Sequence, residues 1–193
     1  MQKEISTYFN QINALAMKIP CKSIEELGII IFEAYKNGRR IFVFGNGGGS
    51  ATSSHFVCDL AKGTATPGKP RLKAISLSDN VPLITAWAND TDYTNTFGEQ
   101  LKNLVEEGDV VIGLSGSGMS PNVINAFRVA NRAGAISVLL SGYSGGEAAP
   151  VADKSIIVPS EDMQHIEDIH LMLCHIVFKM VRNRIREINL YQE

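Results

Sequence analysis

Residues 40–50 read RIFVFGNGGGS, so a short apolar run passes directly into a glycine-rich segment. Similar apolar runs recur along the chain at 72–77, 110–114, 136–140 and 155–158. Runs of this kind are typical of strands that are buried on both faces of a parallel sheet. Helix-length stretches separate the runs, at 50–62, 81–87, 97–106, 122–133 and, more briefly, 146–152. Strands that alternate with helices predict an α/β fold, a three-layer α/β/α sandwich around a five-stranded parallel sheet.

Helices are also predicted before this core. Apolar residues recur every three or four positions over residues 5–19, and Pro20 ends that helix. Ser23 and Glu26 have the spacing of a capping box, which predicts that a second helix begins at Ser23 and closes near Gly38. The N-terminal region is therefore expected to be a helical extension.

The length of the chain bounds its organisation. With 193 residues and a mass of 21.0 kDa, the chain fits one domain. A long last helix is predicted over 163–188. We therefore expect a single domain over 1–193, composed of the helical extension, the α/β core and a C-terminal helix at 1–38, 39–160 and 161–193.

Composition excludes several classes of protein. Lys and Arg total 18 and Asp and Glu total 20, and this net charge of −2 argues against a nucleic-acid binder. Hydrophobic residues make up 45% of the chain, and no apolar run approaches the roughly 20 residues of a membrane span, so we expect neither disorder nor a membrane protein. The polar first residues MQKEISTYFNQ, and three cysteines without a CxxC pair, lead us to expect a cytoplasmic protein.

The glycines at 45–50 stand between a predicted strand and a predicted helix. At such a junction in a parallel sheet, backbone N–H groups at the helix N-terminus can approach an anion. The segment lacks the Lys-Ser/Thr pair of a Walker loop and the GxGxxG spacing, so ATP and dinucleotides are disfavoured. It predicts a phosphate site, and a tight turn without a ligand is the alternative.

A second cluster, SGSGMSPN at 115–122, also follows a predicted strand and precedes a predicted helix. Its hydroxyls on Ser115, Ser117 and Ser120 can surround a phosphate monoester with neutral donors, so no cationic side chain is required. A flexible Ser/Gly linker is the alternative, but a linker would not stand between two elements of one sheet. The cluster predicts a second part of a phosphate site.

Two His–carboxylate pairs have helical spacing. His55 and Asp59 are four residues apart on the helix after the first glycine cluster, so they share one face. Glu167 and His175 lie about 80° apart around the last helix. Together they offer four nitrogen and oxygen ligands suited to Zn²⁺ or a related divalent ion. A surface ion pair and a core histidine are the alternatives.

The last helix is predicted to be apolar on two sides. One stripe includes Ile166 and Ile169, and a second includes Leu171 and Phe178. A helix of this kind is expected to be buried on both sides, in a subunit interface. The other two histidines of this helix project in other directions and are expected to be structural or exposed: His165 and His170.

Four longer segments carry a resemblance to a known family. They are GNGGGSATSSHF at 45–56, AND at 88–90, GDVVIGLSGSGMSPNV at 108–123 and HIEDIHLMLCH at 165–175. Over nearly the whole chain, the sequence resembles the phosphoheptose isomerases of the SIS (sugar isomerase) domain family. The resemblance implies an aldose–ketose isomerase of carbohydrate metabolism and heptose biosynthesis that interconverts sedoheptulose 7-phosphate and D-glycero-D-manno-heptose 7-phosphate. It also implies a homotetramer with active sites at subunit interfaces, and zinc in some members.

The resemblance further implies roles for individual residues. Asp59 stands at the position of the base and His175 at that of the acid, for a proton transfer through a cis-enediol. The implied metal ligands are His55, Asp59, Glu167 and His175. The implied sugar-phosphate contacts are Asn46, Gly48, Gly49, Ser50, Asp90, Ser115, Ser117 and Ser120.

The chain departs from the family pattern at four of its positions. Gly49 replaces a serine, Asp59 a glutamate, Glu167 a glutamine and Gly116 a threonine. These changes indicate a subfamily adapted to another phosphosugar, or one that binds metal more firmly. Two further hypotheses are a non-catalytic SIS protein, which binds phosphosugars or associates with a bacterial replication initiator, and an isomerase of another sugar phosphate.

Overall fold

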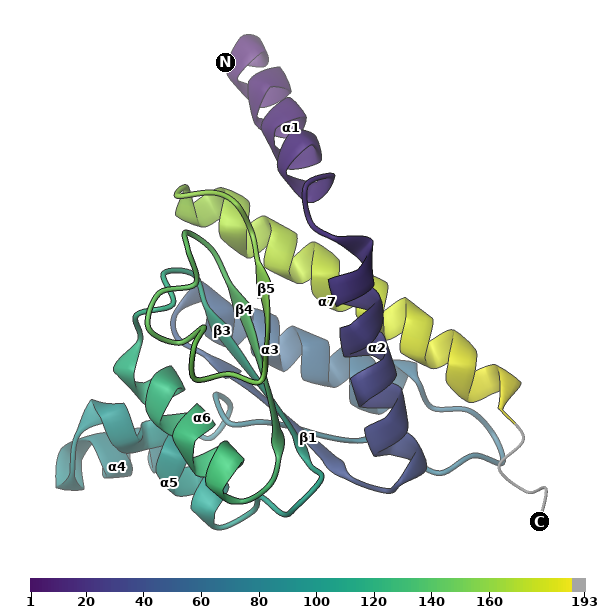
Figure 1. The fold of residues 1–193 in the computed structure, drawn as a ribbon, viewed down its shortest axis with the longest axis vertical. Helices are drawn as coiled ribbons and strands as arrows, with labels where there is room; N and C mark the ends of the chain where they lie inside the picture. The colour runs from purple at the N-terminus through teal and green to yellow at the C-terminus, as the bar shows by residue number, and fades with distance from the viewer. Residues whose placement is uncertain (189–193) are drawn as a thin grey trace.

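A five-stranded parallel sheet forms the middle of the molecule (Figure 1). The computed structural model describes residues 1–188 of the chain. The strands follow the order β2-β1-β3-β4-β5, and every pair is parallel. Their bounds are β1 Arg40–Gly45, β2 Lys73–Ser76, β3 Val110–Ser115, β4 Ile136–Ser141 and β5 Lys154–Ile157. The predicted five-stranded parallel sheet is confirmed.

Helices cover both faces of the sheet. The helices are α1 Gln2–Ala16, α2 Cys21–Lys36, α3 Gly48–Cys58, the π-helical turn η1 Asp59–Gly63, α4 Val81–Asp90, the 3-10 turn η2 Tyr93–Asn95, α5 Thr96–Lys102, α6 Pro121–Arg132 and α7 Met163–Glu187. Ile41 and Val43 of β1 pack on one side, in a core built with α2, α3 and α7. Phe42 and Phe44 alternate with them and pack on the other side against α5 and α6. The three-layer α/β/α prediction is therefore confirmed.

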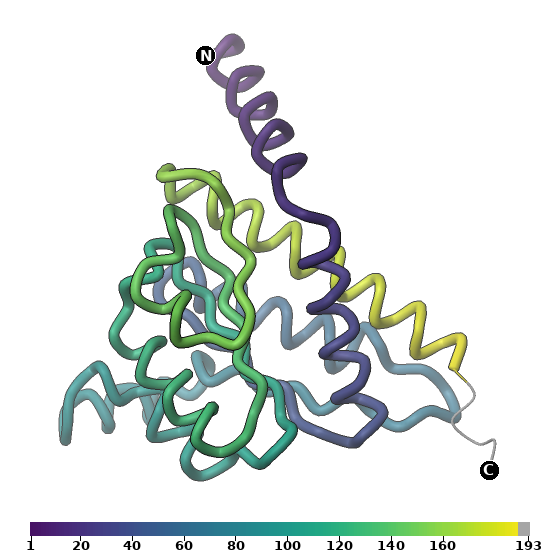
Figure 2. Tube along the Cα trace, viewed as in Figure 1, coloured from purple at the N-terminus to yellow at the C-terminus, as the bar shows by residue number. Residues whose placement is uncertain are grey.

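The first helix projects away from these layers, as the traces in Figures 1 and 2 show. None of the residues of α1 is buried, and Phe9 is 67% exposed. Its attachment to the core includes Tyr8, whose hydroxyl donates to Asp168 of α7 at 2.6 Å and whose ring lies against His165. That hydrogen bond raises the pKa of Tyr8 to about 12. The second helix, in contrast, belongs to the layer formed with α3 and α7.

Two predicted features are wrong. The capping box at Ser23 does not form, because Pro20 already has the extended backbone of an N-cap and α2 begins at once at Cys21. The short helix at 146–152 is a series of turns. Gly145 precedes this segment with φ of +85° and Gly146 begins it with φ of +53°, values that no right-handed helix contains.

The remaining differences concern helix ends. The predicted helix at 97–106 ends at Lys102, and the one at 81–87 continues to Asp90. Residues 189–193 of the predicted C-terminal segment lie outside the described residues. None of the helices within residues 1–188 combines the length and the hydropathy that crossing a membrane requires.

Candidate functional site

A cavity of about 270 Å³ opens at the carboxyl edge of β1 and β3. The loops after these two strands and the N-terminal half of α7 form its wall. Its lining residues are Asn46, Gly47, Gly48, Gly49, Leu114, Ser115, Gly116, Ser117, Ser120, Met163, Glu167 and His170. We call this space the serine-loop cavity. It brings together the two glycine clusters that the sequence placed at strand ends.

Neutral donors predominate in the serine-loop cavity. Helix α3 begins at Gly48 and α6 at Pro121, so the N-termini of two helices lie at or beside it. Ser115 Oγ donates to Ser120 Oγ at 3.0 Å, and Ser117 Oγ accepts from the N–H of Met119 at 3.2 Å. No lysine or arginine is among the lining residues. Helix N-termini and hydroxyls are the groups that bind a phosphate without a cationic side chain.

The amide of Asn46 is held in place beside this cavity. Asn46 and Asn122 exchange two side-chain hydrogen bonds of 2.9 Å, and Tyr93 donates to Asn46 Oδ1 at 3.0 Å. Asn122 is itself buried at the start of α6. Sequence reasoning singled out Asn46 but missed Asn122 and Tyr93. Asn122 stood inside the quoted SGSGMSPN cluster, so its amide was the available signal.

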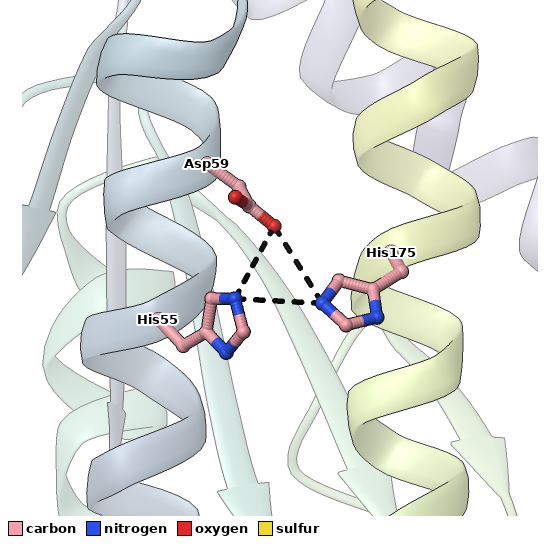
Figure 3. A group of neighbouring side chains, drawn as sticks. All are labelled: His55, Asp59 and His175. Atoms are coloured by element: carbon pink, nitrogen blue, oxygen red, sulfur yellow. Dashed lines mark hydrogen bonds and ion pairs between the residues drawn. The ribbon is translucent and has the colours of Figure 1, made fainter.

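Three titratable side chains meet where the end of α3 and the start of η1 lie beside α7 (Figure 3). His55 comes from α3, Asp59 from the start of η1 and His175 from α7. The two Nε2 atoms lie 3.5 Å apart, and Asp59 Oδ2 lies 3.8 Å from each of them. Two imidazole nitrogens and one carboxylate oxygen around a common point could hold a metal ion. We call His55, Asp59 and His175 the triad.

The triad lies in a second hollow, of about 460 Å³, whose other walls are Phe178, Lys179 and Arg182. The Arg182 guanidinium lies over the Phe178 ring, 5.1 Å from its centroid. Neither Lys179 nor Arg182 forms an ion pair within residues 1–188. This hollow therefore combines the acid–base groups of the triad with two positive charges that form no ion pair within residues 1–188, and Asp59 is the carboxylate in its wall. The excess of positive charge favours anionic ligands.

Comparison with known proteins identifies the family of this fold and site. The family described as SIS domain matches residues 7–142. A phosphoheptose isomerase of Thermodesulfovibrio yellowstonii is 38% identical over 165 residues, which cover 86% of this chain and 82% of that one. The chain belongs to the phosphoheptose isomerase family. A probable phosphoheptose isomerase of Thermoplasma volcanium is 33% identical, with 92% and 90% of the two chains covered.

Solved structures agree with this membership of the phosphoheptose isomerase family. The phosphoheptose isomerase of Neisseria gonorrhoeae superposes with a TM-score of 0.87, at 26% identity and over 94% of this chain and 98% of that one. A phosphoheptose isomerase from Francisella tularensis gives the same TM-score of 0.87 at 25% identity, with 94% and 98% of the two chains covered. The resemblance drawn from the four sequence segments is confirmed.

Three residues suggested by the family pattern lie apart from the sites for which the pattern suggested them. Glu167 stands beside Gly48 in the serine-loop cavity and outside the triad, so its place as a fourth metal ligand stays a prediction. Asp90 is exposed at the end of α4 and accepts from Asn89 at 2.8 Å, outside both cavities. Ser50 donates to the Gly47 carbonyl at 2.7 Å and does not line the serine-loop cavity.

The expectation that His170 projects away from the site is wrong, although its burial agrees with the structural alternative. The sequence interpretation turned it away from the site, whereas the structure places it in the wall of the serine-loop cavity, only 2% exposed. Met163, Glu167 and His170 follow one another at four and three residues along α7, so they share a face. That spacing was the signal that could have found His170. Burial lowers the pKa of His170 to about 4, and a weaker hydrogen bond with the backbone of Ser141 opposes the shift.

The buried His170 makes the stability of the fold depend on pH. The unfolded chain binds a proton at this ring below about pH 6.5, but the folded chain does so only near pH 4. The stabilising effect is therefore complete above pH 6.5 and is lost as the pH falls toward 4. We expect the free energy of unfolding to drop by about 2 kcal/mol from pH 7 to pH 5 because of this group. Urea unfolding of the native chain and of His170→Leu at both pH values isolates the effect, and an identical drop in both proteins would contradict it.

Proposed function

We propose that this chain is an aldose–ketose isomerase that interconverts sedoheptulose 7-phosphate and D-glycero-D-manno-heptose 7-phosphate. The observation that carries the proposal is the placement of the triad and the serine-loop cavity along one pair of helices, α3 and α7. The cavity suits a phosphate, and the triad supplies acid–base groups next along the helices. The names of the related proteins point to the same reaction.

The reaction moves one proton between neighbouring carbon atoms. Asp59 Oδ2 faces both imidazoles, which leaves Oδ1 to take the proton from C1 of the ketose and return it to C2. His175 moves a proton between the oxygens on C2 and C1 while the cis-enediol exists. Ser115, Ser117 and Ser120, with the amides of the glycine loop, hold the phosphate. Fixing that end of the substrate places its carbonyl end at a constant distance from the triad.

The donor set of the triad fits a divalent cation, and we propose Zn²⁺, with another divalent ion as the alternative. Two imidazole nitrogens and a carboxylate oxygen are ligands that zinc accepts, and the partly exposed hollow leaves room for substrate. Such an ion would polarise the substrate carbonyl as a Lewis acid. Glu167 is the candidate for a fourth ligand.

Metal content provides a direct test of this site. His55→Ala removes one of three ligands and is expected to lower the affinity for Zn²⁺ by more than about tenfold, since even groups that only orient a ligand have effects of that scale. Elemental analysis of protein purified without chelator measures the bound metal. His165→Gln is the control, because His165 lies outside the triad. A native chain that is metal-free and takes up no added Zn²⁺ would exclude the metal site.

Assembly and location are proposed together with the activity. We propose a homotetramer, since α1 projects with Ile5 and Phe9 exposed and α7 leaves Met172 and Ile176 uncovered. A hollow lined by apolar groups of α2 and α7 lies beside Ile176. A single domain, a cytoplasmic location and the absence of nucleic-acid binding remain part of the proposal, in keeping with the net charge of −2.

A substrate screen decides between this function and its alternatives. Purified protein supplied with Zn²⁺ or another divalent ion is incubated with sugar phosphates of five to seven carbons, and ketose-to-aldose conversion is followed. We expect conversion of sedoheptulose 7-phosphate. A protein that converts only a shorter sugar phosphate would be an isomerase of another substrate, and one that binds without converting any would be a non-catalytic phosphosugar-binding protein. The comparisons give no support to the latter.

A further inference from the structure

His170 stands at a position in the serine-loop cavity where a polar side chain is costly. It is 2% exposed, and its Nε2 has no hydrogen-bond partner within residues 1–188. An unsatisfied buried nitrogen lowers the stability of the fold. The ring nevertheless lines the cavity together with Ser115, Ser117 and Glu167. Because Nε2 is itself buried, a ligand in the cavity would reach this unpaired nitrogen through a small displacement of the ring.

The surroundings of the ring indicate which kind of hydrogen bond Nε2 can make. Burial keeps the imidazole neutral, so the ring carries a single N–H. The hydrogen bond with the Ser141 backbone raises the pKa of His170. This is the direction expected when the Ser141 carbonyl accepts the N–H of the imidazole ring. Nε2, which has no partner, is then the nitrogen with the free lone pair, and it accepts hydrogen bonds.

A hydrogen-bond acceptor at Nε2 of His170 can bind only those groups of a sugar phosphate that donate a hydrogen bond. The dianion of a phosphate monoester offers only acceptor oxygens and cannot donate to Nε2. The hydroxyl groups of a sugar can donate. The serines and helix N-termini of the same cavity already provide donors for phosphate. The ligand group opposite His170 is therefore a hydroxyl of the sugar.

We propose that His170 is a substrate-binding residue whose Nε2 accepts a hydrogen bond from a sugar hydroxyl of the phosphosugar in the serine-loop cavity. This inference rests on the proposed function, because it takes a sugar phosphate as the ligand. It assigns a specificity role to a histidine outside the triad. It also explains why an unpaired buried nitrogen is retained, since binding satisfies it.

Removal of the polar ring should separate binding from stability. His170→Leu has no nitrogen to satisfy, and the Ser141 carbonyl keeps a partner because it also accepts from the N–H of Val158 at 2.8 Å. We expect the Tm to stay the same or rise. The Kd for sedoheptulose 7-phosphate should rise about 10–100-fold, the effect of 1–3 kcal/mol. The Kd for methyl phosphate, a monoester whose dianion has no O–H, should stay within about twofold, because that dianion cannot donate to Nε2.

The experiment is a calorimetric titration of the native chain and three variants with both ligands, together with KM and kcat. Ser117→Ala is the matched comparison, because loss of a phosphate contact should weaken both ligands. His170→Gln restores a polar group and should bind the sugar phosphate at least about threefold more tightly than His170→Leu. An unchanged Kd for the sugar phosphate in His170→Leu would overturn the proposal. A lowered Tm with equal weakening of both ligands would also overturn it, since that is a structural effect.

Failure of the proposed function gives a different result. If the native chain binds sedoheptulose 7-phosphate without converting it, the isomerase function fails, while the binding comparison still tests His170. If the native chain converts the sugar phosphate and His170→Leu has the same KM and Kd, only the role of His170 fails. A native chain that binds methyl phosphate but no sugar phosphate overturns both.

Discussion

Replacement of His175 by alanine is expected to lower kcat for sedoheptulose 7-phosphate by about a hundredfold or more, the usual scale for loss of a general acid or base. Asp59→Ala should have an effect of similar size. The two side chains act on the same enediol, so the double variant should be little slower than either single variant. Conversion of ketose to aldose, followed by chromatography under saturating substrate, measures kcat directly.

His165→Gln is the control for this experiment. His165 stands on the same helix but contacts Tyr8 and lies outside the triad and both cavities. We expect it to keep kcat within about threefold of the native chain, as changes away from the reacting groups usually do. A His175→Ala protein that keeps more than a tenth of the native kcat would rule out the acid role assigned here.

The parts of the fold that local sequence determines were predictable. Strands β1 and β3 are buried on both faces, so their apolar runs are enough to predict them without knowledge of the rest of the chain. The segment at 146–152 behaves differently, because its conformation depends on a distant loop. The N–H of Ala148 donates to the carbonyl of Gly118, across 30 residues of sequence. No local pattern contains that contact.

In the candidate site, too, local sequence predicted some features, while others depend on contacts between distant parts of the chain. The four-residue spacing of His55 and Asp59 predicted a shared helix face, and the structure bears this out. The approach of His175 to them depends on the packing of α3 against α7, which are more than 100 residues apart in the chain. Family resemblance, and not spacing, supplied that link. His170 was missed because its place in the cavity wall depends on the loop after β3, which lines the same cavity as the start of α7.

Gly118→Ala is expected to lower the free energy of unfolding by about 3 kcal/mol or more and to abolish sugar-phosphate binding. Gly118 has φ of +68°, which costs a residue with a side chain about 1–2 kcal/mol. A Cβ there would also overlap the backbone of Gly145 and Gly146. Neither segment can retreat easily, because the Gly118 carbonyl accepts from Ala148 at 2.9 Å and the Gly118 N–H donates to Ser115 at 3.0 Å. Urea unfolding measures the first effect, and titration with sedoheptulose 7-phosphate and with inorganic phosphate measures the second.

Gly68→Ala is the control, because it has the energetic cost of a positive φ but lacks the steric overlap that a Cβ at Gly118 would cause. Gly68 has φ of +74°, but no heavy atom lies within 4 Å of the place its Cβ would take. It should lose only about 1 kcal/mol and bind phosphate normally. Equal destabilisation by the two substitutions would mean that the stability of the loop after β3 does not depend on its packing against Gly145 and Gly146. A larger loss at Gly118, accompanied by loss of phosphate binding, would mean that this packing fixes Ser117 and Ser120 in the geometry that the ligand requires.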